Sequence, residues 1–201
     1  MKNSKLIYGA LCCLAAMSMI FTSCNKDDGN GKLTPEEKKA AFEAVKGNYT
    51  GKLIYAATNP KNPKDLTDTI STSWSILTDS TMKISQIPAS VLAENITNAD
   101  VKTELAKQDP QDINCSISFV SISPITFLIN PASPTYTFAY GGKSHKVQVA
   151  FYVNNAYSFG ALNTKNALQM QIVEGAIYVD DAETQYLNQA IPLVFIMDKK
   201  Q

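Results

Sequence analysis

Residues 66–76, LTDTISTSWSI, carry the clearest strand pattern in the chain. Apolar side chains share one parity, at Leu66, Ile70, Trp74 and Ile76, and hydroxyl side chains fill the other, at Thr67, Thr69, Ser71, Ser73 and Ser75. Because successive side chains of a strand point to opposite faces, this pattern predicts a strand with one face on a core and the other in water. A row of hydroxyls is also a surface on which a sugar could bind.

The same alternation returns along the chain between turn residues. Further strands are expected near residues 49–55, 82–87, 113–119, 125–129, 135–140, 145–153, 167–173 and 191–197. About 8–9 strands with mostly short connections predict a mainly β fold, either an antiparallel β-barrel or a β-sandwich.

Two helical stretches accompany these strands. Thr34-Pro35-Glu36-Glu37 has the form of a helix start, because threonine can cap and Glu37 stands three residues later, as in a capping box. This N-terminal helix is expected to end at Gly47. Apolar residues at helical spacing also predict a short helical insert within residues 88–107, between the third and fourth strands.

The composition limits the classes of partner. With 45% hydrophobic and 18% charged residues, the chain is that of an ordinary globular protein. All 18 basic residues are lysines, so the planar guanidinium that binds phosphate in a bidentate way is missing. Together with a formal net charge of zero, this argues against nucleic acid as a partner.

Residues 1–23 have the layout of a secretory signal peptide. Two lysines precede an uncharged apolar run, and small residues then stand before Cys24. The run is shorter than the about 20 apolar residues of a membrane-spanning helix. Removal of residues 1–23 is therefore expected, with a retained anchor helix as the alternative. Cys115 would then be a lone cysteine in a strand, where it is expected to be a small buried hydrophobe.

Phe21-Thr22-Ser23-Cys24 resembles the lipobox of bacterial lipoproteins, in which the cysteine is acylated and the chain is cut before it. The resemblance implies lipidation of Cys24, and two or more acyl chains anchor a protein stably to a membrane. An ordinary signal peptide with a chance cysteine is the alternative.

Lys26, Asp27 and Asp28 follow this cysteine and resemble the acidic export signal of Bacteroidetes surface lipoproteins. The resemblance implies a lipid-anchored protein of the outer membrane that faces the cell surface, with a periplasm-facing orientation as the alternative. In this interpretation residues 24–32 are a flexible tether, and residues 33–201 are a single mostly β domain.

Gly47-Asn48-Tyr49 resembles the Gly-x-Trp opening of lipocalin-like barrels, in which a short helix also precedes the first strand. The chain as a whole resembles the uncharacterised Bacteroidetes lipoproteins that carry a domain of unknown function. These resemblances imply a fold and a location, and no activity.

No catalytic residues, metal site or cofactor are expected from the sequence. His145 is the only histidine and is expected at a strand end, half in solvent, whereas zinc sites take several His or Cys ligands. Residues 140–144, YGGKS, lack the spacing of a phosphate loop and predict a hairpin turn. Asp180 and Asp181 could bind calcium, or could precede a helix starting within residues 184–188.

The remaining candidates for ligand binding are aromatic: Tyr140, Tyr157 and Phe159 are expected near loops, where they could line a pocket or a partner surface. The sequence therefore favours a non-enzymatic envelope binding module for a glycan, a lipid or a small apolar ligand. A structural or accessory subunit that binds another envelope protein is the alternative. A carboxylate-based envelope hydrolase is the third possibility.

Overall fold

Strand β2 (Thr67–Ile76) forms where the hydroxyl pattern predicts it. Trp74 and Ile76 are buried, and the alternating hydroxyl side chains are half-buried or exposed. Leu66 precedes the strand and is 44% exposed, so the apolar parity reaches the core only toward the end of β2. The strand pairs antiparallel with β1 (Gly47–Ala56) on one side and β3 (Thr81–Ile87) on the other.

Eight antiparallel strands close into a barrel in the part of the chain that the computed structural model describes, residues 32–58, 60–61, 65–153, 157–163 and 165–201. The remaining barrel strands are β4 (Gln111–Ile122), β5 (Ile125–Pro131), β8 (Phe159–Leu162), β9 (Leu168–Val179) and β11 (Ile191–Lys200). Strand β11 pairs with both β1 and β9, and this double pairing closes the sheet. Of the two expected architectures, the barrel is therefore confirmed and the sandwich is not formed.

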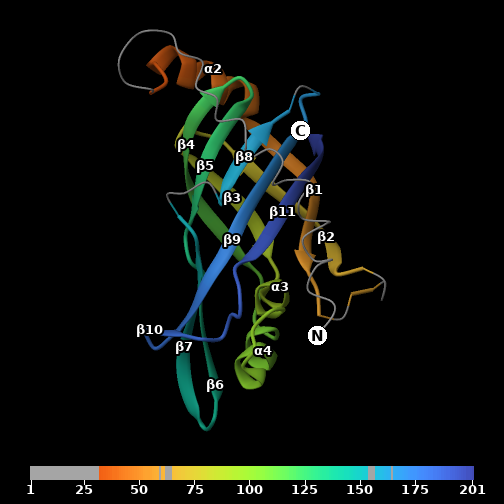
Figure 1. Cartoon of the computed structure of the whole chain (residues 1–201), viewed down its shortest axis with the longest axis vertical. Helices are drawn as coiled ribbons and strands as arrows, with labels where there is room; N and C mark the ends of the chain where they lie inside the picture. The colour runs from red at the N-terminus through yellow and green to blue at the C-terminus, as the bar shows by residue number, and fades with distance from the viewer. Residues whose placement is uncertain (1–31, 59, 62–64, 154–156, 164) are drawn as a thin grey trace. The chain divides into compact units, whose positions relative to one another are not determined.

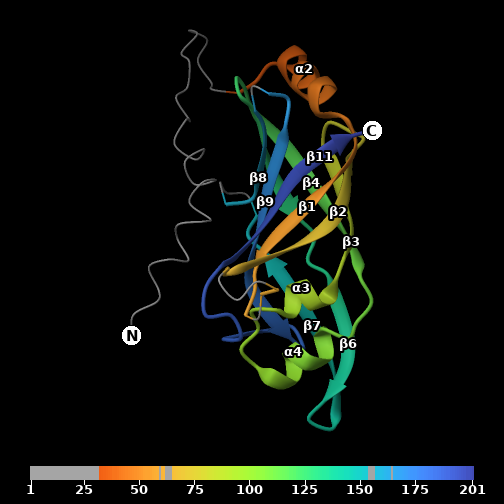
Figure 2. The same cartoon turned by 90° about the vertical axis from the view of Figure 1, so that its right-hand side faces the viewer.

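The barrel strands follow one another around the sheet in chain order, and inserts interrupt this order. Helices α3 (Ala89–Ala93) and α4 (Ala99–Leu105) lie between β3 and β4, strands β6 (Thr135–Tyr140) and β7 (Lys143–Phe151) between β5 and β8, and β10 (Ala182–Thr184) between β9 and β11. Because β3, β5 and β9 all run in the same direction, these inserts gather at one end of the barrel, here called the insert end (Figures 1 and 2).

Helix α2 (Pro35–Val45) lies at the opposite end of the barrel (Figures 1 and 2). The predicted capping box is present: the Glu37 amide donates to the Thr34 hydroxyl at 3.2 Å, and the Thr34 amide donates to the Glu37 carboxylate at 2.8 Å. The helix ends at Val45, two residues before the expected end, and Gly47 already begins β1. The φ of +146° at Gly47 is a conformation that glycine adopts readily.

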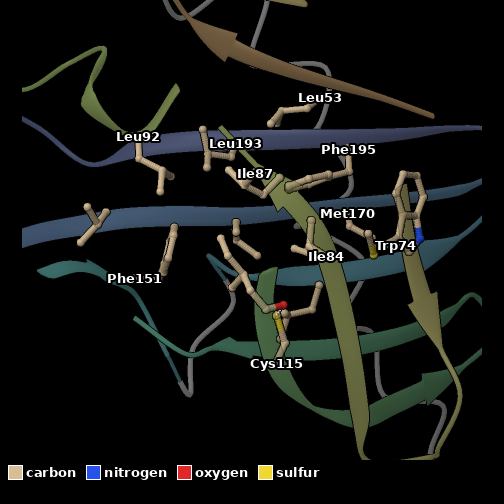
Figure 3. Packing of buried hydrophobic residues seen from close by; sticks show 14 of the residues in the cluster. Leu53, Trp74, Ile84, Ile87, Leu92, Cys115, Phe151, Met170, Leu193 and Phe195 are labelled. Carbon is tan, nitrogen blue, oxygen red and sulfur yellow. Dashed lines mark hydrogen bonds between the residues drawn. The ribbon is translucent and has the colours of Figure 1, made fainter. Parts of the chain in front are cut away.

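Side chains fill the barrel interior. Figure 3 shows Trp74 of β2, Met170 of β9 and Leu193 and Phe195 of β11 pointing inward, with Leu92 entering from α3. The Trp74 ring stacks on Tyr49 at 5.6 Å between centroids, and an eight-strand barrel has an interior just wide enough for such packing. Cys115 is also buried, as predicted; burial raises the pKa of its thiol to about 12.

Three features of the fold differ from the sequence expectations. Strands β8 and β10 were not expected, because each is too short to show an alternating pattern. The helix expected within residues 184–188 is wrong. Asp180 and Asp181 instead have φ values of 51° and 65° and form the tight turn between β9 and β10. A positive φ at both turn residues matches the right-handed twist of the two strands.

Candidate functional site

The floor of the barrel, where β9 leaves it toward the insert end, contains a buried carboxyl group. Glu174 shares the inward parity of Met170 and Ile172 and is 1% exposed. Neither carboxyl oxygen has a hydrogen-bond partner among the described residues, and the same holds for the buried Tyr136 hydroxyl. Burial raises the pKa of Glu174 well above its ordinary value. Burial and then the Glu174 charge raise the pKa of Tyr136 to about 12.

Sequence reasoning did not single out Glu174 among the 18 acidic residues. The available signal is its position within the run IVEGAIYV, residues 172–179, where a lone charge interrupts an otherwise apolar strand. A raised carboxyl pKa is a property of general acids, but this group lies inside the barrel rather than in a cleft.

A groove of about 640 Å³ crosses the outer face of β2, β3, β4 and β5. Its polar lining residues are Ser75, Thr81, Lys83, Asn114, Ser116 and Asn130, and its other lining residues are Leu77, Met82, Cys115, Pro131 and Ala132. These polar side chains face outward because they alternate with buried residues on each strand. We call this feature the outer groove. Its volume falls within the range of about 300–1,000 Å³ that is typical of ligand sites.

The charge of the outer groove is neutralised locally. Lys83 is the only ionisable amine in its described lining, and its Nζ lies 3.0 Å from the Asp112 carboxylate. Asp112 also accepts hydrogen bonds from the backbone and side-chain amides of Gln86, both at 2.9 Å. These bonds, the backbone one first, lower the pKa of Asp112 to about 2. A ligand in the groove would therefore meet hydroxyl and amide groups among apolar surface, without an unpaired lysine.

A smaller pocket of about 320 Å³ lies at the α2 end, lined by Ala44, Tyr49, Leu162, Asn166 and Lys200. The Lys200 ammonium lies over the Tyr49 ring, 5.7 Å from its centroid, and donates to the Ala44 carbonyl at 3.0 Å. The Lys200 ammonium therefore links the end of β11 to the end of α2.

The insert end carries the only histidine of the chain. His145 Nδ1 lies 2.8 Å from the Asp180 carboxylate, and its ring packs on Tyr140 at 4.2 Å between centroids. We call these three residues the distal cluster. Because a carboxylate can only accept, Nδ1 carries the hydrogen and Nε2 of the neutral ring is left as an acceptor.

The local bonds explain the ionisation of the distal cluster. A hydrogen bond from the Lys146 amide, followed by the one from His145, lowers the pKa of Asp180. Burial raises the pKa of Tyr140, with smaller contributions from Tyr186, Asp180 and Asp100. The His145 side chain is 20% exposed, less than the half-solvated histidine that the sequence predicts.

The structure separates the three aromatic residues predicted to bind a ligand. Tyr140 belongs to the distal cluster. Tyr157 and Phe159 lie together at the start of β8, where Phe159 pairs with Leu128 of β5 and Gln171 of β9. Their role in binding stays a prediction.

The other predicted sites are placed as follows. Cys24, Lys26, Asp27 and Asp28 lie outside the described residues. Residues 140–144 form the predicted hairpin turn, with positive φ at Gly141 and Gly142. Within the described ranges, no three His, Cys, Asp or Glu side chains are grouped so that they could hold a metal ion. None of the described helices has the length and apolar character needed to cross a membrane.

The comparisons with known proteins give a family without an assigned activity. A family model described as a domain of unknown function (DUF4840) matches residues 44–179. The match runs from the last turn of α2 to the end of β9 and stops before β11, the strand that closes the barrel. No curated protein and no solved structure matches the chain.

Proposed function

The chain belongs to the family described as a domain of unknown function (DUF4840), and from its geometry we propose a non-enzymatic, lipid-anchored binding module of the cell envelope. The ligand is a polar molecule without net charge, and it binds in the outer groove. The observation that carries this proposal is a ligand-sized groove, lined by hydroxyl and amide groups, on the outside of a barrel whose interior is filled.

The filled interior favours an external ligand. Trp74, Phe127 and Phe195 are each no more than 1% exposed and occupy the space in which a wider barrel could hold a lipid or a small apolar molecule. The outer groove offers groups that both donate and accept hydrogen bonds, and its lysine is paired with Asp112. A polar, uncharged ligand fits this lining better than a lipid or an anion does.

Anchoring through Cys24 rests on the lipobox resemblance and on the acidic cluster Lys26, Asp27 and Asp28. The described domain is compatible with such a tether. The chain enters it through α2, at the end opposite the inserts (Figures 1 and 2).

Two serines on one strand provide a matched test of the outer groove. Ser116 and Ser118 are both exposed on β4, but only Ser116 lines the groove. We expect Ser116→Trp to obstruct the groove and to reduce binding to an array of neutral glycans and neutral hydrophilic peptides at least tenfold. Ser118→Trp should leave binding unchanged. Equal binding by both variants, or no binding by the wild-type chain, would overturn the proposal.

The anchor is tested separately by membrane fractionation and metabolic labelling with a palmitate analogue. We expect Cys24→Ala to lose the label and to leave the membrane fraction or remain unprocessed. Cys115→Ala is the matched control, because this thiol is buried in the barrel. A Cys24→Ala protein that is still labelled and processed would refute lipidation at this residue.

An accessory subunit that binds another envelope protein is the second candidate, and the edge of β6 favours it. Within the described residues β6 pairs with β7 alone, so its other edge could accept a strand from a partner. Hydrogen exchange tests this idea. Alternate amides of Thr135–Tyr140 should be protected in the envelope-extracted protein but not in the purified chain, and identical exchange would argue against it.

A further inference from the structure

Two tyrosines form an exposed pair on the outer surface of the barrel. The side chains of Tyr152 and Tyr157 are 38% and 63% exposed, and their ring centroids lie 5.6 Å apart with 38° between the ring planes. We call this pair the aromatic platform. Single exposed apolar residues are ordinary, but two large rings held against each other in solvent form a recognition surface.

Each tyrosine of the aromatic platform makes specific contacts with the neighbouring strands. A Cβ atom at Gly175 would lie 3.0 Å from Cε1 of Tyr152, so this ring rests directly on the glycine backbone. The buried Ser158 hydroxyl donates to the Tyr152 carbonyl at 2.9 Å. The Gln171 side-chain amide donates to the Tyr157 carbonyl at 2.8 Å. Both tyrosines are therefore attached to β9, a strand of the barrel.

The aromatic platform continues the outer groove. Leu128 of β5 pairs with Phe159 of β8, and the Ile129 amide donates to the Ser158 carbonyl at 2.9 Å. Extended by one more pair, this register would bring Asn130 opposite Tyr157. Asn130 lines the outer groove, and we infer from this register that the groove and the tyrosine pair are neighbours on the outer face.

We propose that the aromatic platform binds a sugar ring and that the outer groove binds the following units of the same glycan. This inference rests on the proposed function and adds the class of ligand. A pyranose has an apolar C–H face, which packs on an aromatic ring, and a rim of hydroxyls, which bond to amide and hydroxyl side chains. The tyrosine rings match the first property, and the lining of the groove matches the second.

The charge of the surface is consistent with a neutral glycan. The platform consists of two tyrosines and contains no acidic or basic residue. The lysine of the groove is paired with Asp112 at 3.0 Å. An acidic polymer would meet no free cation in the described lining of the groove.

The experiment uses the full chain and three neutral hexasaccharides, maltohexaose, cellohexaose and chitohexaose. Saturation-transfer NMR should detect contact between protein and sugar C–H protons for at least one of them. Tyr157→Ala should weaken that binding at least tenfold, whereas Tyr157→Phe should retain it, because the ring face and not the hydroxyl makes the contact. Tyr178→Ala removes a tyrosine from the part of β9 beyond the barrel and should have no effect.

The outcomes separate this inference from the proposed function. Loss of binding in both Tyr157→Ala and Ser116→Trp supports both. Loss in Ser116→Trp alone overturns the aromatic platform and leaves the outer groove. If none of the three hexasaccharides binds the wild-type chain, the inference fails, and the proposed function is then judged by its peptide probes alone.

Discussion

Two carboxyl groups at either end of the part of β9 that extends beyond the barrel have opposite surroundings. Glu174 lies where β9 leaves the barrel, 1% exposed and without a hydrogen-bond partner in the described chain. Asp180 lies six residues later in the turn after β9, with a side chain that is 56% exposed. It accepts hydrogen bonds from His145 at 2.8 Å and from the Lys146 amide at 2.9 Å.

This difference shows that the surroundings of a carboxyl group, more than its residue type, decide the direction in which its pKa is shifted. Burial raises the pKa of Glu174 because water no longer solvates the carboxylate. Hydrogen bonds to the charged form lower the pKa of Asp180. The two groups therefore make opposite contributions to the pH dependence of folding.

The largest effect is expected from Glu174→Gln, measured as the free energy of urea unfolding from pH 5 to 8. The unfolded glutamate loses its proton near pH 4.3, but the folded one keeps it, so wild-type stability is full below that value and falls as pH rises toward the folded pKa. Glutamine does not titrate. The variant should therefore gain stability relative to wild type as pH rises through this window, by on the order of 1 kcal/mol for each pH unit.

Fluorescence of Trp74, the only tryptophan, follows this unfolding from inside the barrel. Asp198→Asn is a suitable control, because this residue near the end of β11 is exposed, whereas Glu174 is buried. If wild type and Glu174→Gln have parallel stability curves over the whole range, the buried carboxyl is not the source of the slope.

The sequence predicted the elements that have a long alternating pattern. Strand β2 and the capping box at Thr34 follow from local chemistry, so the barrel class and the helix positions could be expected. Local chemistry does not show that β11 pairs with both β1 and β9. Closure of the sheet depends on pairing between strands that are distant in the chain. The strands of a barrel and of a sandwich show the same alternation of apolar and polar residues.

The candidate sites were less predictable for the same reason. The outer groove combines residues of four strands, and the bond between His145 and Asp180 joins residues that are 35 positions apart. The helix predicted after Asp181 is wrong, because consecutive aspartates are common both at a helix start and in a turn with positive φ.

A smaller effect is expected from Tyr136→Phe, which removes the other unpaired polar atom near the barrel floor. The hydroxyl is desolvated without a described partner, so its removal should raise the free energy of unfolding by about 1 kcal/mol. Because the Tyr136 ring is retained, packing against the core should not change. A loss of stability would instead show that the hydroxyl is bonded in solution, and the Glu174→Gln variant would show whether that bond involves the carboxyl group.

The smallest effect on stability is expected at Asp180, whose side chain is mostly exposed. Its pKa is lowered in the fold, so its contribution is present above the ordinary carboxyl range and is lost only as pH falls through the folded value. The sharper measurement is the histidine tautomer. The single histidine gives one pair of imidazole ¹⁵N signals, and in wild type the hydrogen should reside on Nδ1, which donates to Asp180.

Asp180→Ala removes that acceptor, so the neutral ring should shift toward the Nε2–H tautomer while the barrel stays folded. Asp181→Ala is the matched control, because this adjacent carboxylate pairs with the Lys146 ammonium at 2.6 Å, whereas Asp180 pairs with the imidazole. An unchanged tautomer in Asp180→Ala would mean that the distal cluster is not held by its carboxylate. The difference between Asp180 and Glu174 would then be a difference in solvent exposure alone.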